Sequence, residues 1–109
     1  MIYIGNAFSL QMVEQNCKVT VTSADIHEVL QEIANNEFTS CIGHENLARV
    51  AGQALGGLSV DQLFHRIDIC LLPGDTLYVC QLKGGRLKKD CTKLPQDVKI
   101  VWRKVIIKE

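Results

Sequence analysis

Three short segments combine residue types that can bind or cleave a phosphate ester. Asn6–Ser9 (NAFS) places small polar side chains directly after an apolar, strand-like stretch. Ser40–Glu45 (SCIGHE) puts Gly43 and His44 where a second such stretch leads into a helical pattern. Unpaired N–H groups at a helix start attract anions, and an imidazole there can protonate a leaving oxygen. Gln81–Lys89 (QLKGGRLKK) sets a glycine pair among cations, which suits close contact with a phosphate.

Each of these segments also has a simpler interpretation. Asn6 and Ser9 are residue types that bond their own backbone in loops. His44 could be an ordinary capping or surface residue, and the basic run could be a solvated turn. Arg66, at the start of a neighbouring expected strand, could join the basic cluster. Residue spacing alone therefore predicts a small domain with an anion site.

Composition and charge narrow the class of protein. The 109 residues are 47% hydrophobic and 22% charged, which is typical of one globular domain over residues 1–109. Lys+Arg and Asp+Glu are 12 each, and aromatic residues make up only 6%, so binding of long nucleic acid is disfavoured. Residues 1–80 hold 3 basic and 9 acidic side chains, whereas residues 81–109 hold 9 basic and 3 acidic. Such a split is typical of a local anion site or of self-association.

The cysteines and histidines give no metal or disulfide pattern. The five cysteines are odd in number, and no two are spaced C-x-x-C, so we expect free thiols in a reducing cytoplasm. The three histidines have no metal-ligand spacing, and no cofactor motif is present. The N-terminus does not look like a signal peptide, and no apolar run has the length of a membrane span. We therefore expect no metal, no cofactor and no membrane partner.

Two helices that would position these segments are predicted from hydrophobic spacing. Ile26–Ile33 has apolar residues at i, i+3, i+4 and i+7, and a similar pattern begins near His44. A capping box at Ser59–Gln62 (SVDQ) predicts one further helical turn. The expected start and stop signals of the two main helices are Thr22 or Ser23, Asn35–Asn36, His44 and Gly56–Gly57.

Short β-branched and apolar runs predict the strands. Leu72–Asp75 (LPGD) suits a type II turn and favours a hairpin between the runs on either side of it. The fold class predicted is α+β, a mixed sheet of about five or six strands with two main helices packed on it. The expected strands are Met1–Gly5, Lys18–Thr22, Phe38–Ile42, Arg66–Leu72, Thr76–Leu82 and Val98–Ile107.

Six segments, taken together and in order, carry a family resemblance across nearly the whole chain. They are Ile4–Leu10 (IGNAFSL), Ile42–Glu45 (IGHE), Arg66–Ile69 (RIDI), Leu72–Asp75 (LPGD), Tyr78–Leu82 (YVCQL) and Arg86–Leu87. The sequence resembles the small viral and prophage ring nucleases that act as type III anti-CRISPR proteins. Each segment is weak by itself, whereas the ordered set at this chain length is fairly specific.

The resemblance implies a function and a set of site residues. It implies a symmetric homodimer that binds cyclic tetra-adenylate at the subunit interface and cleaves it, without a metal, to linear di-adenylates, which ends type III CRISPR signalling. His44 takes the catalytic position. The positions that line the ligand in the family are here Asn6, Ser9, Arg66, Gln81 and Arg86.

The implied chemistry suits these residue types. A ribose 2′-hydroxyl can attack the adjacent phosphate, so no protein nucleophile is needed. The reaction then requires positioning, charge neutralisation and a proton for the departing 5′-oxygen. Arginines can supply the neutralisation, and His44 the proton.

The basic loop departs from the family pattern. The family often has a carboxylate shortly after the arginine, whereas Lys88 and Lys89 follow here, with an extra glycine before Arg86. We therefore expect Lys88 and Lys89 to support binding by charge. Glu45 matches the family's tendency to place an acid beside the histidine, and we count it with Gly43 as a supporting residue.

Two other classes of function compete with a cytoplasmic ring nuclease. One is a sponge that binds a cyclic nucleotide without cutting it, and the other is a small regulatory interaction protein of a mobile element. His44 favours the enzyme over the sponge, while zero net charge and few aromatic residues disfavour nucleic-acid binding in the third class. The sequence leaves open whether the gene belongs to a virus, an integrated element or a CRISPR locus.

Overall fold

Five strands form one mixed sheet in the computed structural model, which describes residues 1–13, 16–87 and 93–109. The strand order is β2-β5-β4-β1-β3, with β1 parallel to β3 and β4, and β5 antiparallel to β4 and β2. This confirms the predicted α+β class with a mixed sheet and two main helices. In chain order the elements are β1 (Ile2–Gly5), the 3-10 helix η1 (Leu10–Met12), β2 (Lys18–Ala24), α1 (Ile26–Asn35), β3 (Phe38–Cys41), α2 (Glu45–Ala54), α3 (Val60–Leu63), β4 (Thr76–Lys83) and β5 (Lys99–Lys108).

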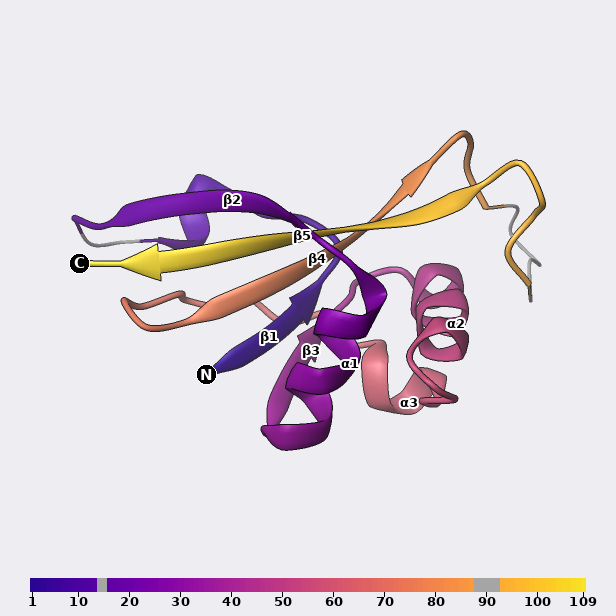
Figure 1. Ribbon diagram of the computed structural model, residues 1–109, viewed down its shortest axis with the longest axis horizontal. Coiled ribbons are helices and arrows are strands. Elements are labelled where there is room, and N and C mark those ends of the chain that lie inside the picture. Colours follow the sequence, from indigo (N-terminus) through magenta and orange to yellow (C-terminus); the bar gives the residue numbers. More distant parts are fainter. Residues whose placement is uncertain (14–15, 88–92) are drawn as a thin grey trace.

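The short strand β1 sets where the parallel strands end. Gly5, its last residue, lies opposite Cys41 of β3 and Val79 of β4. β1 and β3 therefore end together, while β4 continues to Lys83 and stays paired with β5. Figure 1 shows β4 and β5 reaching well beyond the other strands. The loops after β1 and β3 consequently leave the sheet side by side.

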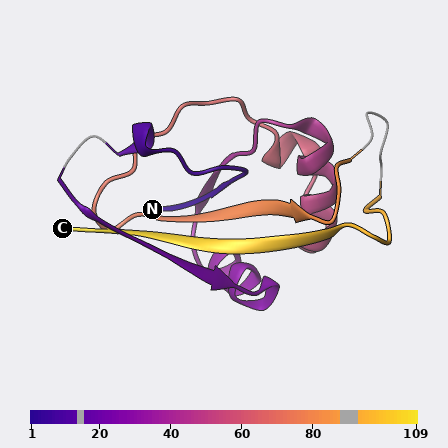
Figure 2. The same ribbon diagram turned by 90° about the horizontal axis from the view of Figure 1, so that it is seen from above.

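The two faces of the sheet pack against different parts of the chain. On the helix-side face, Ile4, Tyr78 and Trp102 share a buried cluster with residues of α1 and α2. On the opposite, loop-side face, Leu77 and Val105 pack against residues of η1 and of segment 66–72. Figure 2 shows α1 on one side of β4 and β5, and η1 on the other. Side chains alternate between the faces along each strand.

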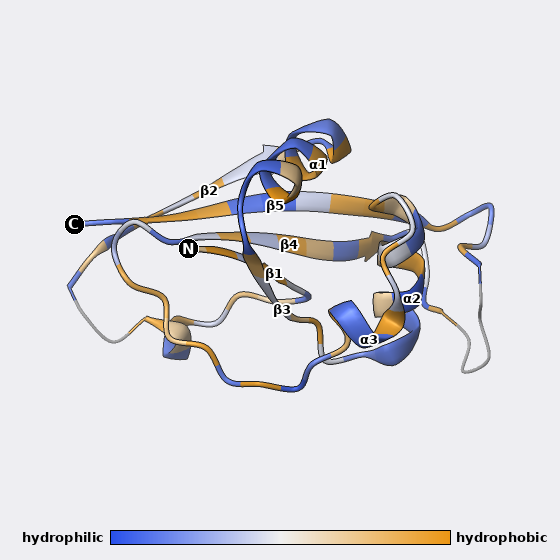
Figure 3. Ribbon diagram, turned by 90° about the horizontal axis from the view of Figure 1, so that it is seen from below, coloured by the Kyte–Doolittle hydropathy of each residue, from blue (hydrophilic) through white to orange (hydrophobic). Residues whose placement is uncertain are grey.

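Helix α1 confirms the predicted periodicity and ends at Asn35, with Asn36 as its C-cap, which agrees with the predicted stop at Asn35–Asn36. Figure 3 shows its hydrophobic side turned toward the sheet and its hydrophilic side turned away. The Tyr78 hydroxyl donates to Glu28 Oε2 at 3.1 Å, and Lys104 Nζ lies 3.1 Å from the same oxygen. Burial, together with the charges of Glu32 and Glu28, raises the pKa of Tyr78. A hydrogen-bonded ion pair thus fixes α1 to the sheet.

The predicted cap of α1 at Thr22 or Ser23 is wrong. Strand β2 continues through both residues as far as Ala24, which lies opposite Trp102. Asp25 is the N-cap instead, and its carboxylate accepts the Glu28 amide N–H at 2.9 Å. Pairing with β5 extends the strand, and the cap moves to the first polar residue beyond it.

The start and stop signals of α2 are confirmed. His44 is its N-cap, and the helix ends before Gly56 and Gly57, whose φ angles of 85° and 99° favour glycine. The capping box between Ser59 and Gln62 is present and begins the short helix α3. Caps and periodicity act over a few residues, which is why local sequence predicts them.

The predicted strand Arg66–Leu72, and with it the predicted hairpin, is wrong. The segment has no regular structure, because β1 occupies the position beside β4 as a parallel partner. Ile69 and Leu71 instead pack onto the loop-side face, and the Leu71 amide donates to the Met12 carbonyl at 2.7 Å. The turn at Leu72–Asp75 is confirmed by the Asp75 N–H to Leu72 carbonyl bond of 2.9 Å and by a φ of 98° at Gly74. This turn connects the irregular segment 66–72 to the start of β4 at Thr76.

The cysteines of the described segments are free thiols. Cys80 is fully buried on the helix-side face, and burial raises its thiol pKa to about 12. Cys17, Cys41 and Cys70 are also unpaired, and Cys91 lies outside the described residues. Among residues 1–13, 16–87 and 93–109, no helix is long and apolar enough to cross a bilayer.

We expect Ser40→Ala to lower the free energy of unfolding by about 1–3 kcal/mol, because a buried hydrogen bond is lost. Ser40 is 4% exposed, and its hydroxyl donates to the Leu63 carbonyl at 2.6 Å. Urea unfolding followed by the fluorescence of Trp102 measures the change. Thr39→Ala, at the half-buried neighbour in β3, is the control. Equal destabilisation by both variants would contradict the assignment.

Candidate functional site

Two side chains hold the peptide groups of Gly43 from opposite sides. Asn6 Oδ1 accepts the Gly43 N–H at 3.0 Å, and Arg66 Nε donates to the Gly43 carbonyl at 3.2 Å. Asn6, Gly43 and Arg66 come from three separate parts of the chain, and we refer to them as the Gly43 clamp. The clamp fixes the backbone immediately before His44.

The parallel strands and the end of α3 bring the clamp together. Asn6 directly follows β1 and Gly43 lies two residues after β3, so their loops leave the same edge of the sheet. The Ser40 hydroxyl holds the Leu63 carbonyl, and the His65 N–H donates to the Ile42 carbonyl at 3.0 Å. These two bonds hold residues 63–65 along the edge formed by β3 and Ile42, which places Arg66 beside Gly43.

Gly43 lies between β3 and α2 and has ordinary backbone geometry, since it is not one of the glycines with a positive φ angle. A Cβ at Gly43 would lie 3.8 Å from Arg66 Cγ and 3.9 Å from Asn6 Oδ1, which is ordinary van der Waals contact. Gly5 is more restricted, because a Cβ there would lie 2.8 Å from Cys41 Sγ. Close contact between the ends of β1 and β3 therefore depends on Gly5.

His44 is exposed at the start of α2. Its carbonyl accepts the Ala48 N–H at 2.9 Å, and its side chain makes no capping hydrogen bond. The exposed imidazole therefore lies beside the N-terminus of α2. An imidazole in this position can give a proton to an anion bound beside it.

Arg66 has donors left for a ligand. Its Nε is the one guanidinium nitrogen that bonds to another described residue, the Gly43 carbonyl, and its guanidinium carbon lies 5.6 Å from the centre of the Phe64 ring. The side chain is exposed, and stacking on Phe64 restricts its orientation. The two terminal nitrogens can thus still make the paired hydrogen bonds that arginine forms with phosphate.

Ser9 and Glu45 make local contacts instead of joining the clamp. Ser9 Oγ accepts the Gln11 N–H at 3.3 Å and caps η1, which is the loop alternative considered from sequence. The Glu45 carboxylate lies 3.6 Å from Arg49 Nη2 one helical turn away. Within the described contacts, Glu45 does not reach His44.

Gln81 and Arg86 lie along the extension of β4 and beyond it. Gln81 is exposed, two residues past the position where β1 ends. Arg86 is exposed in the connection to β5, and no contact within the described residues joins it to the Gly43 clamp. Gly84 starts this connection with a φ of 99°, and a Cβ there would collide with the Asp97 carbonyl. Lys88 and Lys89 lie outside the described residues.

Sequence reasoning missed the structural roles of Asn6 and Arg66 in holding Gly43. The sequence does show that Asn6 and Gly43 each follow a strand, β1 and β3. It does not show that these two strands are neighbours in the sheet, which is what brings the two residues together. The described residues include no group of three or more His, Cys, Asp or Glu side chains arranged to hold a metal ion.

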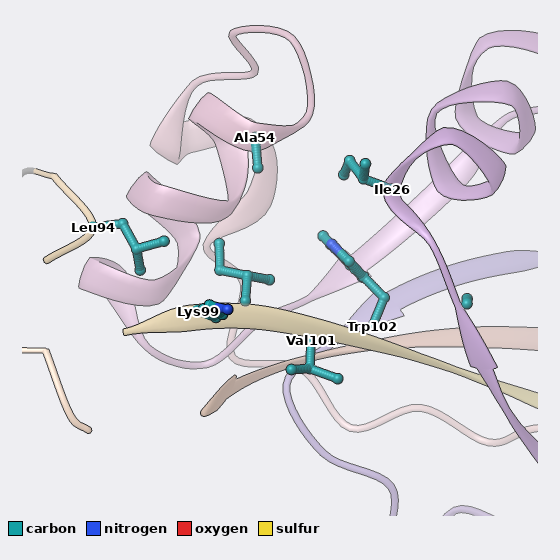
Figure 4. Close-up of a pocket in the computed structure, with 8 residues that line it drawn as sticks. Ile26, Ala54, Leu94, Lys99, Val101 and Trp102 are labelled. Atoms are coloured by element: carbon teal, nitrogen blue, oxygen red, sulfur yellow. The ribbon is translucent and has the colours of Figure 1, made fainter. Parts of the chain in front are cut away.

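A hollow of about 530 Å³ lies on the helix-side face, away from the clamp. Figure 4 shows Ile26, Ala54 and Trp102 around it, with Val101 pointing away to the other face of the sheet. Its lining is mainly apolar and includes none of the residues predicted for the site.

We expect Asn6→Ala to speed hydrogen exchange of the Gly43 amide by about tenfold, as loss of a bond worth about 1–1.5 kcal/mol implies. The exchange rate is measured by NMR. Ser9→Ala, which removes only a local cap, should leave the Gly43 rate unchanged. An unaltered Gly43 rate in Asn6→Ala would show that Asn6 does not hold this peptide.

Comparison with known proteins agrees with this fold. Among curated proteins, none matches the chain. The solved structure of B116 of Sulfolobus turreted icosahedral virus (STIV) is similar, with a TM-score of 0.76 and 16% sequence identity, covering 96% of this chain and 97% of that chain. At this identity the similarity concerns the fold alone. The family model described as STIV B116-like matches residues 2–101, and the chain therefore belongs to the STIV B116-like family.

Proposed function

We propose that this protein is a metal-independent ring nuclease that binds cyclic tetra-adenylate in a homodimer and cleaves it to linear di-adenylates. The observation that carries the proposal is the Gly43 clamp. Hydrogen bonds of 3.0 Å from the Gly43 N–H to Asn6 and of 3.2 Å from Arg66 to the Gly43 carbonyl hold the backbone before His44, whose side chain is exposed. A fixed backbone with a free imidazole suits a proton donor that must meet one particular oxygen. In a host cytoplasm this activity would end type III CRISPR signalling for a virus or an integrated element.

The proposed reaction uses only groups of the ligand and of the protein, together with solvent water. The 2′-oxygen of a ribose forms a bond to the adjacent phosphorus and passes its proton to water. The bond from phosphorus to the 5′-oxygen breaks, and His44 protonates that oxygen, leaving a 2′,3′-cyclic phosphate. The terminal nitrogens of Arg66, left free by the clamp, offset charge on the phosphate.

Two features support a second copy of the chain at the site. Leu10 and Ile67 are 79% and 49% exposed, and they directly follow Ser9 and Arg66. Apolar side chains beside polar site residues are typical of a surface that a partner covers. Arg86 makes no contact with the clamp of its own chain within the described residues, so we propose that it serves the site of the partner subunit. A two-fold dimer also matches the symmetry of a cyclic tetranucleotide.

We expect His44→Ala to abolish cleavage while retaining most of the binding. Loss of a general acid typically lowers a rate by ~10²–10⁴-fold. The assay follows labelled cyclic tetra-adenylate in EDTA under single-turnover conditions, with binding measured on the same samples. His27→Ala, which changes a solvent-exposed histidine of α1, is the matched control and should cut normally. Cleavage by His44→Ala at the wild-type rate would contradict the role of His44.

The same assay separates the three classes of function. Cleavage in EDTA supports the ring nuclease. Retention of the intact ring by the wild-type protein would favour the sponge. Absence of any interaction with the ring would favour a regulatory interaction protein.

We expect inactive subunits to complement one another. Mixing His44→Ala with Arg86→Ala should give activity well above that of either variant alone, because a mixed dimer has one site with both residues intact when Arg86 acts on the partner. Light scattering should give twice the mass of the 12.2 kDa chain. A monomer with and without ring, or no gain on mixing, would contradict the shared site.

A further inference from the structure

The basic part of the sequence, residues 81–109, contributes three cations to one patch of the sheet. Lys83 of β4 and Lys99 of β5 lie directly opposite each other, and Arg103 of β5 lies opposite Val79. By the alternation along each strand, all three positions belong to the loop-side face with Val79; Lys99, at the end of β5, also lines the edge of the hollow on the helix-side face. Figure 4 shows Val101, between Lys99 and Arg103, pointing away from the helices. All three cations are exposed.

Within residues 1–13, 16–87 and 93–109, these cations have no carboxylate partner. The ion pairs of the described residues join the N-terminus to Asp75, Arg49 to Glu45, and Lys104 to Glu28. Lys104, on the opposite face to its neighbour Arg103, is thus neutralised, while Arg103 forms no ion pair with any other described residue. Like charges directly opposite each other in a sheet are destabilising. The pair Lys83 and Lys99 is therefore unfavourable, as is the pair Lys18 and Lys108 at the other end of β5, but only Lys83 and Lys99 lie beside the candidate site.

The cationic patch lies next to the candidate site on the sheet. Along β4, Gln81 lies two residues beyond Val79, the partner of Gly5, and Asn6 leaves the sheet at that level. Gln81 lies between Val79 and Lys83 on the loop-side face, opposite Val101. The packed cluster formed by η1 and segment 66–72 covers Leu77 and Val79 but not Gln81. An open, polar surface therefore continues from the end of β1 onto the cations.

We infer that Gln81, Lys83, Lys99 and Arg103 form a phosphate floor that binds the backbone of an oligonucleotide ligand. This inference rests on the proposed function for the identity of the ligand as a cyclic tetra-adenylate. Lys99 and Arg103 are four residues apart, about 13 Å along a strand, and Lys83 adds a cation from the next strand. That spread suits a ligand with several phosphates better than one with a single phosphate.

The test compares two variants that each remove two positive charges. Lys99→Gln with Arg103→Gln removes cations of the phosphate floor. Lys18→Gln with Lys108→Gln removes a cross-strand lysine pair from the other end of β5. Both are made on a His44→Ala background, so that the ring stays intact, and equilibrium binding of cyclic tetra-adenylate is measured across a salt series.

We expect the floor variant to bind the ring at least tenfold more weakly and with a smaller salt dependence, because fewer phosphates are neutralised. The control should change affinity less than threefold. Equal affinities of the two variants would overturn the phosphate floor, and the proposed function would stand.

If the parent protein does not bind the ring, the proposed function fails and a second probe tests the floor by itself. Inorganic tripolyphosphate at low salt should shift the backbone NMR signals of residues 81–83 and 99–103. Loss of these shifts in the floor variant, but not in the control, would support the floor as a site for another polyphosphate. Absence of the shifts in the parent would overturn it.

Discussion

The arrangement of this protein depends on the parallel pairing of β1 with two neighbours. β1 has only four residues, and all four are paired on both sides, with β3 and with β4. Parallel strands end at the same edge of a sheet, so the loops that follow them are brought together there. Gly5 allows the end of β3 to approach, since a side chain at that position would meet Cys41 Sγ. The loop beginning at Asn6 and the loop containing Gly43 are consequently neighbours.

A second consequence of this strand pairing is that side chains from separate segments fix the backbone of the candidate site at Gly43. Asn6 and Arg66 are the types of residue usually assigned to ligand binding, yet each uses part of its hydrogen-bonding capacity on Gly43. Asn6 keeps its amide N–H donors and Arg66 keeps its terminal nitrogens. Both residues therefore hold the backbone before His44 and still have donors for a ligand. Substitution of either one removes two things at once, a support of that backbone and a group able to bind a ligand.

The neutral net charge of the chain hides a strong local separation. Lys104 is matched by Glu28 on the helix-side face, whereas Lys83, Lys99 and Arg103 at loop-side positions form no ion pair in the part of the chain that the structure describes. The acidic residues of the first 80 positions lie partly on α1, where Glu28 holds Tyr78 and Lys104. Overall charge balance thus argues against binding of long nucleic acid, while the positive face stays suited to a small phosphate ligand.

The sequence by itself determined the local elements of this fold and the residue types of its site. Periodicity predicted α1 and α2, the capping box predicted α3, and the Leu72–Asp75 turn formed as expected, since each depends on hydrogen bonds or burial within a few residues. The tertiary structure alone decided which strands pair. Residues 66–72 alternate like a strand but lost the place beside β4 to β1, because a parallel β1 between β3 and β4 buries Ile4. That long-range choice placed Arg66 on Gly43 and separated Arg86 from the clamp, which no spacing along the chain could reveal.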